Sequence, residues 1–188
     1  MAHAVDLHPL FGIAKGYAAE QALEAMRNAG AQRALVALGG DIVVGAPPPG
    51  ESGWRIDVAP LDVPGAPPGT TLSLQHAAVS TAGDAEQWMQ VDGVRHSHVL
   101  DARTGWPLTF RSATTVVAPH GLQADGLGTA ASVLGAEAGF RLLAAVPGSA
   151  ALMVRQDPGG RVRRLASKDW PSPAAAPATV AASLETYR

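Results

Sequence analysis

A carboxylate and a hydroxyl stand four residues apart in the segment ADGLGTAAS at 124–132. If this segment is helical, the side chains of Asp125 and Thr129 lie one turn apart on the same face. Carboxylate and hydroxyl oxygens are hard ligands that suit Mg²⁺, and the free N–H groups of a first helical turn favour a nearby phosphate. Taken alone, the pair is more typical of a structural role, in which Asp125 caps the helix and Thr129 packs.

Two histidines stand two residues apart in HSHVLDARTG at 96–105. On a strand, His96 and His98 would point to the same face, with Asp101 just past the strand's end. A histidine that titrates near neutral pH can accept the proton of a hydroxyl. The same spacing could bind zinc, with Asp101 or a distant histidine as a further ligand. A third interpretation, one surface and one core histidine, is about as well supported by the spacing.

A lysine lies between two glycines in FGIAKGYA at 11–18, where a helix is expected to begin. Backbone amides beside Gly12 and Gly16, together with the Lys15 ammonium, could approach a phosphate-bearing ligand closely. The spacing is not that of a Walker loop. A surface lysine at a glycine-broken helix start is the simpler interpretation. However, only Lys15 and Lys168 are lysines in a chain that otherwise uses arginine, which indicates a specific role.

Two turn-forming segments add further polar groups. In STAGDAEQ at 80–87, the side chains of Ser80, Thr81 and Asp84 could contact a ligand, although turn chemistry alone explains them. Gly39, Gly40 and Asp41 form another tight turn after a buried strand. This turn is not a dinucleotide-binding fingerprint, because no helix with a third glycine follows it.

The hydrophobic pattern predicts the elements that would position these residues. Helix-favouring residues at helical spacing predict helices over 14–29 and 122–146. Apolar and alternating runs predict strands, and an Asp92-Gly93 pair predicts a hairpin turn. The expected strands lie within 33–44, 54–58, 70–81, 88–91, 94–100, 112–118, 149–155 and 161–166. We therefore expect one α+β domain with a mixed β-sheet and two main helices, with Arg161, Arg163 and Arg164 on a solvated strand edge.

The composition of the 188 residues excludes several classes of protein. The chain has no cysteine, which excludes disulfides, thiolate metal sites and a lipid-modified cysteine. Its net charge of −2 gives no attraction to nucleic acid. The N-terminus MAHAVDLHPL lacks the features of a signal peptide, so as written the chain is expected to be cytoplasmic. From Pro171 onward the chain is rich in proline and alanine and is expected to be disordered.

The ordered set of these motifs resembles the C-terminal half of the FAD:protein FMN transferases, the ApbE-type flavin transferase family. The motifs are GIAKGYA at 12–18, LGGD at 38–41, STAGD at 80–84, DGVRHSHVLDARTGWP at 92–107 and ADGLGTAASVLG at 124–135. The resemblance places an ApbE-like domain over 10–168, followed by the tail at 171–188. Three residues depart from the family pattern: Glu20 stands where aspartate is usual, Ala82 where serine is common and Ala85 where an aromatic residue is common. The usual Asp-Leu-Gly ahead of the AKG segment is also interrupted, because four residues separate Leu7 from Gly12.

The resemblance implies a role for each matched position. Asp125 and Thr129 match the side-chain ligands of Mg²⁺, and Gly12 matches the position whose backbone carbonyl completes the protein's share of that site. Lys15 falls where the family contacts the flavin nucleotide, and Thr81 falls in a segment expected to bind the same cofactor. His98 matches the catalytic base.

The implied reaction is Mg²⁺-dependent transfer of FMN from FAD to a threonine or serine hydroxyl of a target protein, with release of AMP. The implied partners are FAD, an acceptor protein and either a second copy of this chain or a missing N-terminal half. Such a half helps to bind the FAD adenine in the family, whose members are often periplasmic. Two alternatives stay open: a non-catalytic relative that binds a flavin nucleotide or a partner, and a histidine-based zinc hydrolase.

Overall fold

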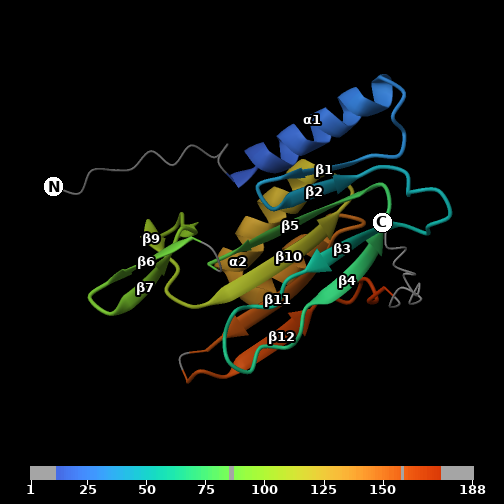
Figure 1. Cartoon of the computed structure of the whole chain (residues 1–188). Coiled ribbons are helices and arrows are strands. Elements are labelled where there is room, and N and C mark those ends of the chain that lie inside the picture. Colours follow the sequence, from blue (N-terminus) through green and yellow to red (C-terminus); the bar gives the residue numbers. More distant parts are fainter. Residues whose placement is uncertain (1–11, 85–86, 158, 175–188) are drawn as a thin grey trace, which may run out of the picture.

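A six-stranded antiparallel sheet forms the centre of the computed structural model, which describes residues 12–84, 87–157 and 159–174 (Figure 1). Its strand order is β1-β2-β5-β10-β11-β12, and each neighbouring pair is antiparallel. The helices are α1 (Ala14–Asn28) and α2 (Gly121–Ala144). The strands of the main sheet are β1 (Leu35–Leu38), β2 (Asp41–Val44), β5 (Ala77–Gly83), β10 (Ser112–Ala118), β11 (Ala150–Gln156) and β12 (Val162–Ala166).

Three two-stranded ribbons complete the fold. One is β3 (Trp54–Val58) with β4 (Thr70–Leu74), the second is β6 (Trp88–Val91) with β7 (Val94–Ser97), and the third is β8 (Leu100–Asp101) with β9 (Trp106–Pro107). In Figure 1, α2 lies behind the main sheet, the β3–β4 ribbon lies in front of it, and β6, β7 and β9 extend beyond its end. We call the segment from β6 to β9 the arm.

The central strand β10 shows why the sheet is covered on both faces. All seven of its residues are buried, which is typical of a strand with apolar layers above and below. Val116 and Ala118 belong to the core that the helices cover, whereas Ala113 and Val117 belong to the core beneath the β3–β4 ribbon. Alternate residues of one strand therefore pack into two separate cores.

The two helices touch through a pair of glycines. A Cβ added at Gly16 of α1 would lie 2.1 Å from the backbone oxygen of Gly121, and a Cβ added at Gly121 would lie 2.2 Å from the oxygen of Gly16. Both neighbouring atoms belong to backbone, so neither can move aside without separating the helices. This contact brings the first turn of α1 against the first turn of α2.

We expect Gly16→Ala to lower the free energy of unfolding by about 3 kcal/mol, because its methyl group overlaps a helix backbone that is itself packed on the sheet. Gly12→Ala is the matched control, since a Cβ there meets no atom within 4 Å. Urea unfolding of the two variants and the wild type measures the difference. Equal midpoints for the two variants would contradict this account of the helix contact.

The structure confirms the α+β class, with two main helices and a single domain, and each expected strand region contains a strand. Asp92 and Gly93 have φ of 49° and 78°, as the expected hairpin turn between β6 and β7 requires. β12, which carries Arg163 and Arg164, is the edge strand that was expected. The long second helix differs from expectation, because Gly135 has φ 76° and ψ 177° and interrupts α2.

Parts of the expected organisation lie outside the described residues. These are the N-terminal segment up to residue 11 and the tail from residue 175. Residues 171–174 are described, and the Ala174 N–H donates to the Thr71 carbonyl of β4 at 2.7 Å. Within the part of the chain that the structure describes, no helix is long and apolar enough to cross a membrane.

Candidate functional site

Asp125 lies in the second turn of α2, where it is almost fully buried. Its Oδ2 accepts a hydrogen bond from the Gly16 N–H of α1 at 3.0 Å. The interpretation of Asp125 as the helix cap is wrong, because the N-cap residue is His120. Glu20 of α1 takes over the capping, since its carboxylate accepts from the Gly121 N–H at 3.0 Å and contacts His120 Nδ1 at 2.7 Å. Asp125 therefore keeps an oxygen for another partner.

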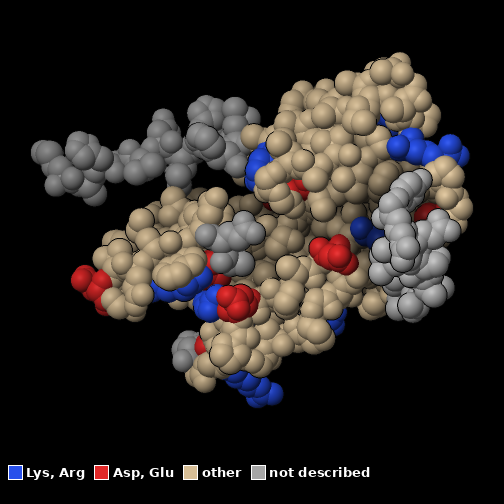
Figure 2. Space-filling model, viewed as in Figure 1, with Lys and Arg blue, Asp and Glu red and all other residues tan. Residues whose placement is uncertain are grey.

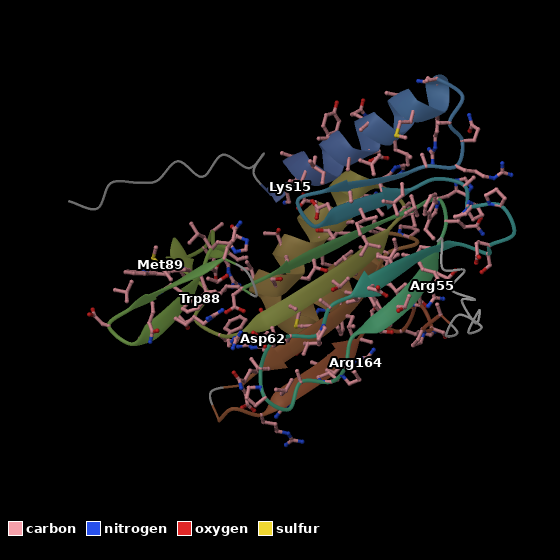
Figure 3. The ribbon with its side chains drawn as sticks, viewed as in Figure 1. Lys15, Arg55, Asp62, Trp88, Met89 and Arg164 are labelled. Carbon is pink, nitrogen blue, oxygen red and sulfur yellow. The ribbon has the colours of Figure 1, made fainter. Side chains whose placement is uncertain are left out.

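That partner is Lys15, whose ammonium lies between two carboxylates. Lys15 Nζ is 3.5 Å from Asp125 Oδ1 and 3.5 Å from Asp41 Oδ2. Figure 3 shows Lys15 at the beginning of α1, and Figure 2 shows a basic group with only a trace of acidic surface near it in that region, because Asp41 and Asp125 are buried. The stem of Lys15 rests on Gly39, where an added Cβ would lie 3.0 Å from the lysine Cδ. Gly39 also has φ 56°, so the turn before β2 favours glycine here.

Asp41 is the functional candidate that the sequence analysis missed. It is the first residue of β2 and is 3% exposed, and its Oδ2 is buried without a hydrogen bond among the described residues. Burial raises the pKa of the Asp41 carboxyl above its ordinary value, and the neighbouring Asp125 carboxylate raises it further, while Ser80 and Lys15 act in the opposite direction. The one sequence signal was the acidic residue that follows the glycine pair in LGGD.

Thr129 and Gly12 lie near two members of this cluster in the sequence: Thr129 follows Asp125 on α2, and Gly12 precedes Lys15 at the beginning of α1. Thr129 is half-buried, one turn after Asp125. A Cβ at the neighbouring Gly128 would lie 3.9 Å from Ser80 Oγ, so this turn of α2 packs on β5. Gly12 is half-buried just before α1, and its neighbour Ile13 would contact a Cβ at Gly126 at 3.1 Å. The structure thus brings together the two segments that carry the three predicted metal residues.

The donor set of this cluster fits a small hard cation. The carboxylates of Asp41 and Asp125 meet at Lys15, and Thr129 carries a hydroxyl one helical turn after Asp125. Carboxylate and hydroxyl oxygens are ligands of the kind that Mg²⁺ prefers. Asp41 Oδ2 supports the fit, because it is buried without a hydrogen bond among the described residues and its charge is balanced only from 3.5 Å, by the Lys15 ammonium. No group of three or more histidine, aspartate or glutamate side chains is placed to hold a metal among the described residues, which disfavours the histidine-based zinc site.

His98 lies on the arm, just after β7. The expectation that one strand carries both histidines is wrong, because β7 ends at Ser97. The His98 N–H donates to the Gln87 carbonyl at 3.2 Å, and His98 Nδ1 lies 3.2 Å from the same oxygen. With the proton on Nδ1, the ring donates to Gln87 and leaves Nε2 as an acceptor. The His98 side chain is exposed, so a hydroxyl can reach it from solvent.

Asp101 and His96 are the other two residues of the arm that were considered as zinc ligands. Asp101 accepts hydrogen bonds from the Arg103 backbone and guanidinium, which lower its pKa to about 2. This pairing leaves Asp101 poorly placed as a zinc ligand beside the histidines. His96 is half-buried, and its Nδ1 is buried without a hydrogen bond in the described part of the chain.

Asp84 anchors the arm to the sheet. It is 1% exposed, accepts from the Ser112 N–H of β10 at 3.0 Å and forms an ion pair with Arg95 of β7. The Arg95 guanidinium also stacks over the Trp88 ring, 3.6 Å from its centroid. Asp84 is therefore engaged inside the protein rather than with a ligand, and its bonds fix the direction in which β7 leads to His98.

Thr81 lies on the opposite face of β5 from Ser80. Its hydroxyl is 2.9 Å from the Thr115 hydroxyl, on the face that the β3–β4 ribbon covers. A cofactor contact by Thr81 stays a prediction. Likewise, no contact found among the described residues joins His98 to the cluster of Lys15, Asp41 and Asp125.

Comparisons with known proteins agree with the arrangement of these motifs. A sequence model of the ApbE family matches residues 5–153. The FAD:protein FMN transferase of Treponema pallidum is 32% identical over 157 residues, which are 79% of this chain and 43% of that protein. The enzyme of the same name from Klebsiella pneumoniae is 35% identical over 127 residues, which are 66% of this chain and 36% of that protein.

Solved structures show the same relationship. The flavin transferase ApbE from Vibrio cholerae superposes with a TM-score of 0.70 at 29% identity, over 85% of this chain and 50% of that one. The flavinyl transferase ApbE from Pseudomonas stutzeri gives 0.68 at 34% identity, over 85% and 49%. The chain spans about half the length of the relatives that it matches. The match over 5–153, together with these identities and superpositions, shows that the chain belongs to the ApbE family.

Proposed function

We propose that this chain carries the metal-binding and proton-accepting parts of an FAD:protein FMN transferase. The observation that supports this most directly is the convergence of two buried carboxylates on one cationic group, Lys15 Nζ, beside Thr129 and the segment that begins at Gly12. The names of the relatives supply the reaction class: transfer of FMN from FAD to a protein.

In the proposed reaction, Asp125, Thr129 and the Gly12 carbonyl would hold Mg²⁺, with Lys15 close by. When bound, the cation would neutralise charge on the FAD pyrophosphate. Lys15, whose side chain is 44% exposed, reaches the same anionic group from α1. Fixed charges of this kind supply most of the acceleration in phosphoryl transfer.

His98 completes the proposed chemistry as the proton acceptor. Its Nε2 takes the proton of a threonine or serine hydroxyl on the acceptor protein. The hydroxyl oxygen forms a bond to the FMN phosphorus, the bond between that phosphorus and the bridging oxygen of the pyrophosphate breaks, and AMP leaves with the bridging oxygen and the bonding electron pair. The exposed position of His98 on the arm suits an acceptor as large as a protein.

A direct assay tests this proposal. The chain is incubated with FAD, Mg²⁺ and an acceptor protein that carries a flavinylatable threonine. The mass of the acceptor is then measured by mass spectrometry. We expect an FMN adduct that disappears when a chelator is added. The FAD:protein FMN transferase of Treponema pallidum serves as the positive control in the same assay. If that enzyme is active while this chain binds one equivalent of FAD and releases no AMP, the result would instead favour a non-catalytic relative.

A further inference from the structure

Lys15 occupies the position that a cation would take between the two buried carboxylates. We propose that Lys15 is a resident counter-ion of this site, and that a divalent cation must displace its ammonium from Asp125 in order to bind. In this exchange Asp41 keeps the lysine close to the site. The inference rests on the proposed function, because it takes Asp125 as a metal ligand.

The distances support a shared ammonium rather than a single ion pair. Lys15 Nζ is 3.5 Å from an oxygen of each carboxylate, a separation at which the charges attract but no short hydrogen bond is formed. Asp41 Oδ2 makes no hydrogen bond among the described residues. Lys15 therefore compensates the charge of both carboxylates while leaving their oxygens incompletely bonded, as a replaceable cation would.

The lysine is the movable member of this group. Its side chain is 44% exposed, whereas those of Asp41 and Asp125 are 5% and 4% exposed. Asp125 is held by the Gly16 N–H at 3.0 Å, and Asp41 begins β2 directly after a glycine turn. A side chain with several rotatable bonds and an open path to solvent can leave, whereas the two carboxylates stay in place.

The exchange gives Lys15 a second task. While its ammonium lies between the two carboxylates, the formal charge of the three side chains is −1, and its displacement from Asp125 exposes the Asp125 carboxylate to the incoming cation. The released ammonium is then available to an anionic ligand at the mouth of the site, such as the pyrophosphate of the flavin substrate. Cation binding would thereby free the lysine for the phosphate-bearing substrate.

The test measures Mg²⁺ affinity directly, by titration calorimetry on the full chain without FAD. We expect Lys15→Met to bind Mg²⁺ about tenfold more tightly than the wild type, because a neighbouring unit charge changes the binding of a charged group by at least this factor. Lys168→Met removes the same charge from the exposed and only other lysine and should leave the affinity unchanged. Lys15→Arg, which keeps the charge, should retain the wild-type affinity.

Two further measurements keep the outcome clear. In EDTA, Lys15→Met should melt at a lower temperature than Lys168→Met, and Mg²⁺ should restore more of its stability. Mg²⁺ affinity in Lys15→Met that is unchanged or weaker, or not measurable in either protein, would overturn the proposal. If the wild type binds Mg²⁺ and Asp125→Asn does not, the metal assignment behind the proposed function stands even when the Lys15→Met result is negative.

Discussion

Replacing Asp125 with asparagine should reduce Mg²⁺-dependent FMN transfer by about 10³-fold or more, while the protein stays folded. The loss of rate follows from removing a charged ligand of a cation that supplies several kcal/mol to phosphoryl transfer. The fold should survive because an asparagine side-chain oxygen can still accept the hydrogen bond that the Gly16 N–H donates to Asp125. The steady-state rate of FMN adduct formation, measured over a range of Mg²⁺ concentrations, checks this expectation.

The choice of asparagine rather than alanine follows from the burial of this residue. Asp125→Ala would leave the Gly16 N–H and one side of Lys15 without a partner, and an unsatisfied buried donor costs about 1–3 kcal/mol. Loss of activity in the alanine variant could then reflect loss of structure. Glu137→Gln is a matched control on the same helix, where an exposed carboxylate pairs with Arg141 four residues later. A rate for Asp125→Asn within twofold of this control would remove Asp125 from the metal site.

The local elements could be predicted from the sequence because local patterns determine them. The Asp92-Gly93 pair specifies the turn between β6 and β7, and alternation at Trp54, Ile56 and Val58 matches the half-buried strand β3. The interruption of α2 at Gly135 could not be predicted in this way, because glycine is also tolerated inside helices. Its effect depends on how each half of the helix packs on the sheet.

The candidate site could be predicted only in part. Motifs on α1 and α2 identified Lys15 and Asp125, but the role of Asp41 depends on a turn that brings LGGD against Lys15 across the fold. In the sequence, the carboxylate of Asp84 could be a ligand contact or simply part of a turn, and only its bonds to Arg95 and Ser112 show that it anchors the arm. Burial and partner choice arise from tertiary structure, and a single sequence does not encode them in any local spacing.

His98→Ala should stop FMN transfer but leave FAD binding intact. We expect the rate to fall by about 10²–10⁴-fold, the usual contribution of a general base. FAD affinity should change little, because the side chain is exposed and, among the described residues, its ring bonds to the Gln87 carbonyl just before β6. Single-turnover transfer and equilibrium FAD binding, both followed by flavin fluorescence, separate the two effects.

His96→Ala is the informative partner of this variant, because it removes the neighbouring imidazole and leaves His98 in place. If His98 is the base, His96→Ala should keep most of the transfer rate, and neither variant should change the metal content of the purified protein. Loss of bound zinc together with activity in His96→Ala would instead support a zinc hydrolase. Retained transfer in His98→Ala would remove His98 as the base, and the proton would then have to pass to another group or to solvent. Asp84 and Arg95 hold β7, and with it the arm, in a fixed direction. If transfer is retained in His98→Ala, the arm would contribute no proton acceptor and would only offer the acceptor protein a surface to bind.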